Sequence, residues 1–170
     1  MTLTFLLGGA RSGKSSLAVE LALAWDGPVM FIATGEPGDD EMAERIRRHQ
    51  AERPLHWQTV EAPVDALSVL ERAPEEAAVV LDCLSLWVAN LLARGDLEPE
   101  IEAASDALAA VAAARPSLTV AVSNEVGLGV VPRTELGRRY RDVLGRVNAR
   151  WAADAQHAAF VVAGRSLRLS

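Results

Sequence analysis

The chain has 170 residues, of which 50% are hydrophobic and 24% charged, and its formal net charge at pH 7 is −6. This length is typical of one domain that buries a core without cross-links, so we expect a single domain over residues 1–170. The negative charge argues against nucleic acid or an anionic membrane surface as a partner. No apolar run approaches the ~20 residues that span a bilayer, and the short N-terminal run lacks a basic residue ahead of it. The single cysteine, Cys83, excludes a disulfide framework and a cysteine-rich zinc site, and it favours a small core residue in a soluble cytoplasmic protein.

Short apolar runs alternate along the chain with longer segments of helical periodicity. The runs predict strands of a sheet that is covered on both faces, and they are 3–7, 29–32, 56–60, 78–81, 118–122 and 160–163. The periodic or charged segments predict helices, and they are 14–25, 39–52, 64–72, 84–93, 98–114 and 134–155. The apolar face expected of the last helix consists of Leu136, Tyr140, Val143, Leu144, Val147 and Trp151. Residues 167–169 are expected to pair as an antiparallel edge strand. The alternation predicts a three-layer α/β domain with a mainly parallel sheet and without internal repeats or linkers.

The first predicted strand leads into a glycine-rich loop that matches the P-loop pattern, Gly-x-x-x-x-Gly-Lys-Ser. The loop consists of Gly8, Gly9, Ala10, Arg11, Ser12, Gly13, Lys14 and Ser15. Its glycines let the backbone curl so that successive N–H groups face phosphate oxygens, and the next helix directs its positive end at the same anion. Lys14 supplies a mobile charge for the β- and γ-phosphates, and the Ser15 hydroxyl can bind Mg²⁺. The loop therefore predicts a nucleoside triphosphate site in a phosphotransfer enzyme.

Polar residues follow two of the later predicted strands. Asp82 comes directly after the strand at 78–81, where P-loop proteins place the acid that supports Mg²⁺. The alternative is that Asp82 only caps the helix that begins near residue 84. Asn124 and Glu125 follow the strand at 118–122, and ligands of open α/β sheets bind at the carboxyl ends of the strands. Both are candidate site residues, with turn formation and capping as the alternative.

Two charged segments leave their roles open. The helix at 39–52 has acids at its start and arginines at its end, as the helix dipole favours, and His49 lies near its end. A surface histidine is one explanation, but neutral imidazole is also a nucleophile that can attack phosphorus at pH 7. Between residues 133 and 150, arginines at 133, 138, 139, 141, 146 and 150 outnumber two acids. This segment is either an anion-binding or subunit-contacting face or a solvated helix surface.

Taken in chain order, these segments resemble the bifunctional adenosylcobinamide kinase / adenosylcobinamide-phosphate guanylyltransferases of cobalamin biosynthesis. Besides the P-loop, the matching segments are 32–34, 40–43, 45–46 with His49, 53–54, 56–57, 124–127, 129–132, 141–142 and 145–148. Each is weak alone, but the ordered set covers nearly the whole chain. One departure is that some members carry two adjacent histidines where this chain has Arg48 and His49. The histidine assignment therefore rests on His49, with His56 as the fallback.

The resemblance implies two reactions. First, the aminopropanol hydroxyl of adenosylcobinamide is phosphorylated by ATP or GTP. Second, a histidine attacks the α-phosphate of GTP, and the GMP-histidine intermediate passes GMP to adenosylcobinamide phosphate, which gives adenosylcobinamide-GDP. By position, His49 and Lys14 are the catalytic residues, and Ser15 and Asp82 bind the metal. The further nucleotide contacts implied are Ala33, Thr34, Gly35, Gln50, Ala51, Glu52, Arg53, Glu61 and Asp82.

The resemblance further implies a P-loop fold of the RecA-like group, Mg²⁺ as cofactor, and a homotrimer. The residues alone leave two other functions open. One is a P-loop kinase of a different small molecule, with no chemistry at His49. The other is a nucleotide-dependent switch or assembly subunit, which would hydrolyse nucleotide slowly and lack a small-molecule acceptor.

Overall fold

The structure is a computed structural model that describes residues 2–36, 38, 44, 47, 50 and 53–169. The described residues form a seven-stranded sheet of order β3-β2-β4-β5-β1-β6-β7. Its strands are β1 (Thr2–Gly8), β2 (Val29–Ala33), β3 (Gln58–Glu61), β4 (Ala78–Asp82), β5 (Leu118–Asn124), β6 (His157–Val162) and β7 (Arg165–Arg168). Neighbouring strands are parallel except for β6 and β7, which are antiparallel. The predicted parallel sheet with an antiparallel C-terminal edge is confirmed.

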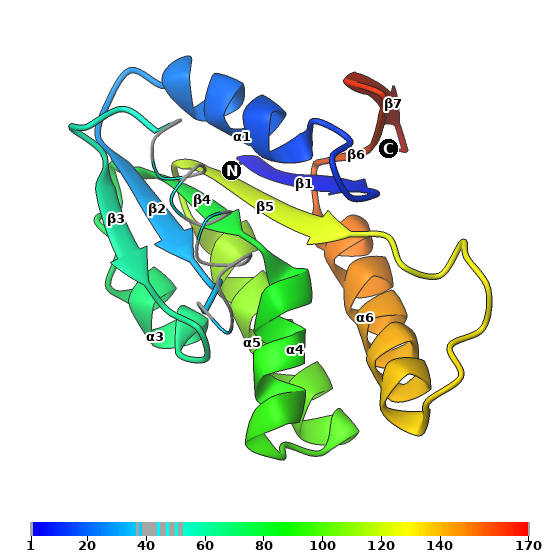
Figure 1. The fold of residues 1–170 in the computed structure, drawn as a ribbon. Helices are drawn as coiled ribbons and strands as arrows, with labels where there is room; N and C mark the ends of the chain where they lie inside the picture. Colours follow the sequence, from blue (N-terminus) through cyan, green and yellow to red (C-terminus); the bar gives the residue numbers. More distant parts are fainter. Residues whose placement is uncertain are drawn as a thin grey trace.

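Helices cover both faces of the sheet, as Figure 1 shows. They are α1 (Lys14–Leu23), α3 (Ala66–Glu71), α4 (Leu84–Arg94), α5 (Glu98–Ala114) and α6 (Glu135–Asp154). One face packs against α1, and the other packs against α3, α4, α5 and α6. The predicted α/β class is therefore confirmed as a three-layer arrangement.

Alternate residues of β1 face two separate apolar cores. Phe5 belongs to the larger core under α3–α6, and Leu6 belongs to the smaller core under α1. Both side chains are buried, as are the first four residues of β2 and of β4. In the larger core the ring of Phe5 lies 6.4 Å from that of Trp151, whose indole N–H donates to Ser105 Oγ at 3.0 Å. Burial on both faces explains why these strands are continuous apolar runs in the sequence.

Several predicted boundaries differ from the structure. The third strand begins at Gln58 instead of residue 56, because a turn closed by the Trp57 N–H and the Pro54 carbonyl oxygen (3.1 Å) precedes it. The helix predicted at 64–72 is shorter, because Pro63 and Asp65 lie in the loop before α3. Leu136, which was expected on the buried face of the last helix, is 60% exposed in its first turn. Of the helix predicted at 39–52, the described residues 44, 47 and 50 are helical, and 39–43, 45, 46, 48, 49, 51 and 52 lie outside the described residues.

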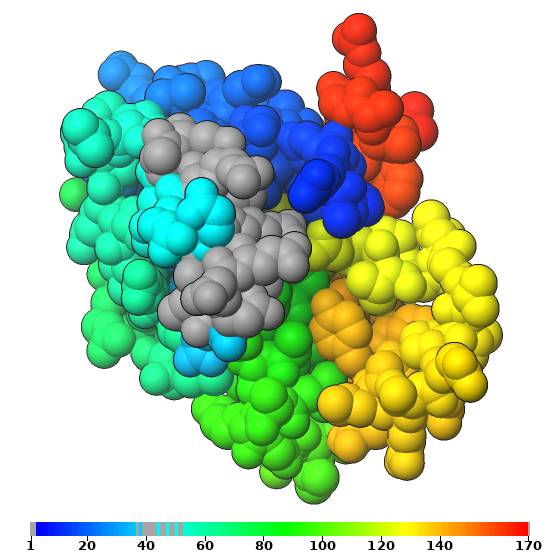
Figure 2. Space-filling model, viewed as in Figure 1, coloured from blue at the N-terminus to red at the C-terminus, as the bar shows by residue number. Residues whose placement is uncertain are grey.

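The antiparallel hairpin of β6 and β7 projects from the edge of the sheet. Its two-residue turn consists of Ala163 and Gly164, which have φ values of 50° and 71°. Two positive φ values are typical of the tight turns that match the twist of paired strands. All four residues of β7 are exposed, and the hairpin stands out from the body in Figure 2. Among the described helices, none combines the length and the apolar character that crossing a bilayer requires.

Candidate phosphate-binding and catalytic site

The glycine loop joins the end of β1 to the start of α1, as predicted, and its shape depends on glycine. A Cβ atom on Gly8 would lie 2.3 Å from the Val161 carbonyl oxygen and 2.8 Å from Ser12 Oγ, which no side chain tolerates. Gly13 has a φ of 99°, in the region that favours glycine, and it directly precedes the first residue of α1. The loop therefore curls between a buried strand and a helix N-terminus, which is the arrangement that binds phosphate.

Lys14 extends from the first turn of α1 back over this loop. Its side chain is 6% exposed, and Nζ donates to the Gly9 carbonyl oxygen at 2.8 Å. The ammonium group is therefore held beside the loop's backbone, where a point charge can pair with phosphate. Ser15, the next residue of the helix, is half-buried.

The sheet order brings the other predicted polar residues to the same edge as the loop. Because β2, β4, β5 and β1 are consecutive neighbours, their carboxyl ends lie side by side. Gly8 is in register with Asn124, and Asp82 is in register with Ala33 on one side and Val122 on the other. Asp82 is half-buried. The N-terminal cap position of α4 is held by Cys83, so Asp82 is not the cap of this helix.

Charges from both sides of this edge act on Cys83. Burial raises the pKa of its thiol from 9.0 to about 11, and the negative charge of Asp82 adds to the rise. A hydrogen bond from Ser85 and the positive charge of Lys14 oppose it. Both charges therefore act on the same buried thiol, the carboxylate raising its pKa and the ammonium lowering it. The predicted core role of Cys83 is confirmed, since the residue is 5% exposed.

A chain of hydrogen bonds ties the ends of β2 and β4 together. The Thr34 hydroxyl, which is fully buried, donates to the Cys83 carbonyl oxygen at 2.7 Å and accepts from the Cys83 N–H at 2.8 Å. Asn90 of α4 donates from Nδ2 to the Thr34 carbonyl oxygen at 2.8 Å and to Pro63 O at 3.0 Å. The Thr34 hydroxyl is thus committed to the protein, as are its carbonyl oxygen and its N–H, which donates to the Asp82 carbonyl oxygen at 3.2 Å. The nucleotide contact expected of Thr34 stays a prediction.

The same chain continues to β5 through Ser85, which is fully buried in the first turn of α4. Ser85 Oγ lies 3.0 Å from Cys83 Sγ and accepts from Asn124 Nδ2 at 2.8 Å. Asn148 of α6 donates from Nδ2 to the Asn124 carbonyl oxygen at 3.1 Å. Asn124 is therefore fixed from two sides beside Gly8. Sequence reasoning did not identify Ser85, Asn90 and Asn148 as parts of this hydrogen-bond network. Their only sign in the sequence is that each is a polar residue on a helix face that otherwise packs against the protein.

The remaining candidates occupy different positions around this edge. The Glu125 N–H donates to Gly8 O at 3.0 Å, while its carboxylate accepts from the Gly127 N–H, so the turn-forming alternative fits its side chain. Glu61 is exposed at the end of β3, in register with Ala33. The guanidinium carbon of Arg53 lies 3.5 Å from the centroid of the Phe31 ring, which is a cation–π contact.

Three of the predicted site residues cannot be placed. His49, Ala51 and Glu52 lie outside the described residues, whereas Gln50 is described as helical and exposed. Gly35 is half-buried in the loop that follows Thr34.

The described residues fit a magnesium ion bound together with a nucleotide. Among them, no group of three or more His, Cys, Asp or Glu side chains forms a metal cluster of its own. Mg²⁺ in nucleotide sites instead takes one or two protein oxygens and completes its shell with phosphates and water. The Ser15 hydroxyl and the Asp82 carboxylate offer oxygen atoms of the kind that such an ion takes.

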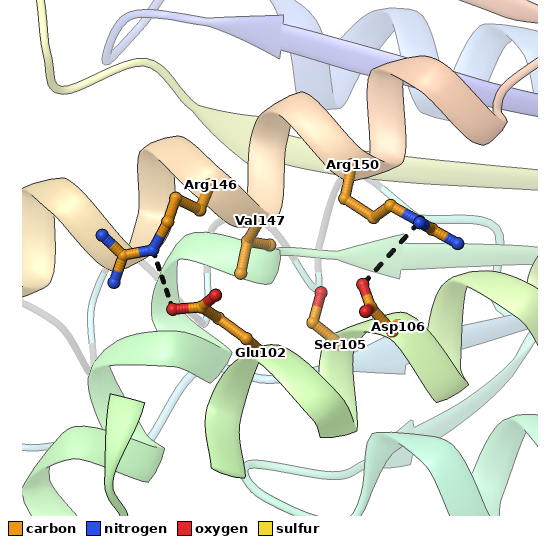
Figure 3. Close-up of a pocket in the computed structure, with 6 residues that line it drawn as sticks. All are labelled: Glu102, Ser105, Asp106, Arg146, Val147 and Arg150. Carbon is orange, nitrogen blue, oxygen red and sulfur yellow. Dashed lines mark hydrogen bonds and ion pairs between the residues drawn. The ribbon is translucent and has the colours of Figure 1, made fainter. Parts of the chain in front are cut away.

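The arginines of α6 pair mainly with acids of α5 instead of facing solvent as a free basic surface. Arg146 contacts Glu102 at 2.7 Å and Glu98 at 2.8 Å, and Arg150 lies 3.7 Å from Asp106. Figure 3 shows the pairs Arg146–Glu102 and Arg150–Asp106 at a pocket between the two helices, which is lined by Glu102, Ser105, Asp106, Arg146, Val147 and Arg150. Arg138 instead donates to the carbonyl oxygens of Pro132 and Arg133. The acid-paired part of the helix fits the solvated-surface alternative, whereas an anion-binding or subunit-contacting role of this face stays a prediction.

The loop, its lysine and the acid at the end of β4 define the chain as a P-loop nucleotide-binding α/β protein. Solved structures agree with this class. A prototypical ATPase of a bacterial type III secretion system matches with a TM-score of 0.55 and 12% identity, over 98% of this chain and 56% of that one. The secretion ATPase EscN of enteropathogenic Escherichia coli, in complex with its central stalk EscO, matches with a TM-score of 0.58 and 12% identity, over 94% of this chain and 41% of that one. At this identity the likeness shows the fold alone, and the chain spans about half the length of these ATPases.

The sequence comparisons are more specific. The family model for cobinamide kinase / cobinamide phosphate guanyltransferase matches residues 4–169. The bifunctional adenosylcobalamin biosynthesis protein CobP of Pseudomonas aeruginosa is 44% identical over 169 residues, which cover 96% of this chain and 95% of that protein. The bifunctional adenosylcobalamin biosynthesis protein CobU of Salmonella typhimurium is 42% identical, over 95% of this chain and 96% of that protein. This chain belongs to the cobinamide kinase / cobinamide phosphate guanyltransferase family.

Proposed function

We propose that this chain is a bifunctional enzyme that phosphorylates adenosylcobinamide and then transfers GMP from GTP to the product, which gives adenosylcobinamide-GDP. The observation that carries the proposal is the P-loop with its buried lysine, in a chain that matches the family over residues 4–169. We propose that one domain over residues 1–170 performs both reactions.

In the kinase reaction, the acceptor hydroxyl oxygen bonds to the γ-phosphorus of ATP or GTP while the bond to the β,γ-bridging oxygen breaks. Negative charge grows on the leaving diphosphate, and the hydroxyl proton is released. The backbone N–H groups of the loop and the ammonium of Lys14 hold the phosphates and stabilise this charge. Mg²⁺, held by the Ser15 hydroxyl and the Asp82 carboxylate, would supply further positive charge at the phosphates.

In the second reaction, an imidazole nitrogen of His49 bonds to the α-phosphorus of GTP, and pyrophosphate leaves. A phosphate oxygen of adenosylcobinamide phosphate then attacks the same phosphorus and displaces the histidine. Splitting the transfer through a covalent intermediate replaces one difficult step by two easier ones. The assignment to His49 rests on the family resemblance of its segment.

The positions of the other two histidines support this assignment. His157 begins β6 in register with Thr4, so it lies toward the amino end of β1 and away from the phosphate loop. His56 lies in the exposed turn before β3. Neither described histidine therefore lies at the edge of the sheet that carries the phosphate loop.

Labelling tests this function directly. The protein is incubated with Mg²⁺ and GTP that carries radiolabel in the α-phosphate, then denatured and separated on a gel. We expect a covalent label that is acid-labile and alkali-stable, absent in His49→Ala and retained in His56→Ala and His157→Ala. A label that persists in His49→Ala would refute the assignment of the nucleophile. No label in the unmodified protein would refute the guanylyltransferase reaction.

We further propose, from the family resemblance, that the chain assembles as a homotrimer. Sedimentation velocity of the purified protein at micromolar concentration tests this. A monomer that is active in both reactions would contradict the trimer proposal without affecting the chemistry.

A further inference from the structure

The turn of the β6–β7 hairpin touches the phosphate loop. Because β6 lies beside β1 in the sheet, the turn after β6 comes next to the loop after β1. The Gly164 N–H donates to the Ser12 carbonyl oxygen at 2.8 Å. The approach is close, since a Cβ atom on Gly13 would lie 3.2 Å from Gly164 Cα. Ser12 is 8% exposed and Gly164 is exposed, so the bond joins a buried loop residue to an exposed turn residue.

This bond has a geometric effect on the next N–H of the loop. In a trans peptide unit, the carbonyl oxygen and the N–H of the following residue point in opposite directions. When the Ser12 carbonyl oxygen is directed at the hairpin, the Gly13 N–H must point away from it. A glycine loop binds phosphate through N–H groups that are turned toward the anion, and Gly13 also marks the N-terminus of α1, where the helix dipole favours negative charge.

We propose that Gly164 is a positioning residue for nucleotide binding: its N–H fixes the Ser12–Gly13 peptide so that the Gly13 N–H faces the triphosphate. Gly164 has a φ of 71°, in the region that favours glycine, and in this turn its N–H is directed at Ser12. A β-branched residue strongly disfavours this conformation, whereas asparagine tolerates it. The proposal rests on the triphosphate binding that both proposed reactions require, but it does not depend on His49.

The chain provides a matched control for a test by substitution. Gly95 ends α4 with a φ of 103°, and Gly164 has a φ of 71°. Neither would bring an added Cβ atom within 4 Å of another group in the described structure. Gly164→Val and Gly95→Val therefore impose the same kind of backbone strain, but only Gly164→Val acts on the phosphate loop. Gly164→Asn keeps the N–H and the conformation, so it serves as the rescue variant.

The measurement is the dissociation constant of each full-length variant for GTP, for inorganic tripolyphosphate and for guanosine, with urea unfolding in parallel. We expect Gly164→Val to bind GTP and tripolyphosphate about tenfold or more weakly, the loss that one hydrogen bond to a charged group predicts. Guanosine binding should not change. Gly95→Val should bind all three like the unmodified protein, and Gly164→Asn should be within about twofold of it.

Several results would overturn the proposal. It fails if Gly164→Val binds tripolyphosphate like the unmodified protein, if Gly95→Val weakens binding equally, or if guanosine affinity falls together with that of tripolyphosphate. If Gly164→Val does not fold, Gly164→Ala takes its place under the same criteria, because it has the smaller side chain. If the unmodified protein binds no triphosphate, the proposed function fails, which is a separate outcome.

Discussion

Replacing Thr34 by valine tests whether one buried hydroxyl holds the ends of β2 and β4 together. Valine has nearly the shape of threonine, so Thr34→Val removes the hydroxyl without opening a cavity. The hydroxyl makes two hydrogen bonds to Cys83, of 2.7 Å to its carbonyl oxygen and 2.8 Å from its N–H. Thr34 is 0% exposed and Cys83 is 5% exposed, so water cannot replace the lost partner.

The expected loss follows from these two bonds. The Cys83 N–H loses its partner, which costs about 1–3 kcal/mol. The Cys83 carbonyl oxygen keeps the Trp87 N–H at 3.2 Å and loses one of two hydrogen bonds, at about 0.5–1.5 kcal/mol. Burying a methyl group in place of the hydroxyl recovers part of this sum, so we expect a net loss of about 1–4 kcal/mol. The matched variant Thr34→Ser keeps both bonds and loses one methyl group, at about 1 kcal/mol. A typical domain has only about 5–15 kcal/mol of stability, so Thr34→Val should be visibly weakened.

Urea unfolding of the three proteins, followed by circular dichroism, measures the difference. The free energies are comparable if the slopes against urea concentration agree. A loss in Thr34→Val no larger than that in Thr34→Ser would refute the reasoning. The kinase rate, measured at a temperature where all three are folded, should also fall most in Thr34→Val, because Asp82 directly precedes Cys83.

Three further predictions concern the same edge of the sheet. Lys14→Ala should lose both the kinase activity and the α-phosphate labelling of His49, and normal labelling in this variant would contradict a shared phosphate site. Burial raises the pKa of the Cys83 thiol from 9.0 to about 11, so this thiol ionises at a lower pH in the unfolded chain than in the folded protein. The free energy of unfolding should therefore fall by about 2–3 kcal/mol as pH rises from 9 to 11. Cys83→Ala should remove this part of the fall, and an unchanged pH profile would show that the thiol is not the source. Ser85→Ala removes the hydroxyl that accepts from Asn124 Nδ2 at 2.8 Å. This variant should lower the kinase kcat by a larger factor than it raises the KM for the nucleotide. Equal changes in kcat and KM would assign Ser85 a purely structural role.

Local features of the chain were sufficient to predict the phosphate loop and most of the sheet. The loop is contiguous in sequence and has a fixed pattern, and the strands beside it are apolar because both of their faces are buried. The start of the third strand was misplaced because Trp57 looks like a strand residue, whereas a turn closed at Pro54 buries it under α1. The exposure of Leu136 was missed because helical periodicity does not show where a helix leaves the core.

The contacts that complete the site join residues far apart in the chain. Asn148 reaches Asn124 from another helix, and Gly164 reaches Ser12 from the other end of the chain. No spacing rule predicts such pairs, because they depend on the order of strands in the sheet. The ion pairs of Arg146 could not be predicted for the same reason, since the acids that pair with it lie on α5.

The place of β1 within the sheet has a consequence for how the protein is made. This strand is synthesised well before both of its partners, since β5 begins at Leu118 and β6 at His157. Pairings over such long separations slow folding, because much chain entropy is lost before the contacts form. The phosphate loop therefore cannot take its final shape when it is synthesised. Its nucleotide-binding form depends on β5 and β6 having left the ribosome.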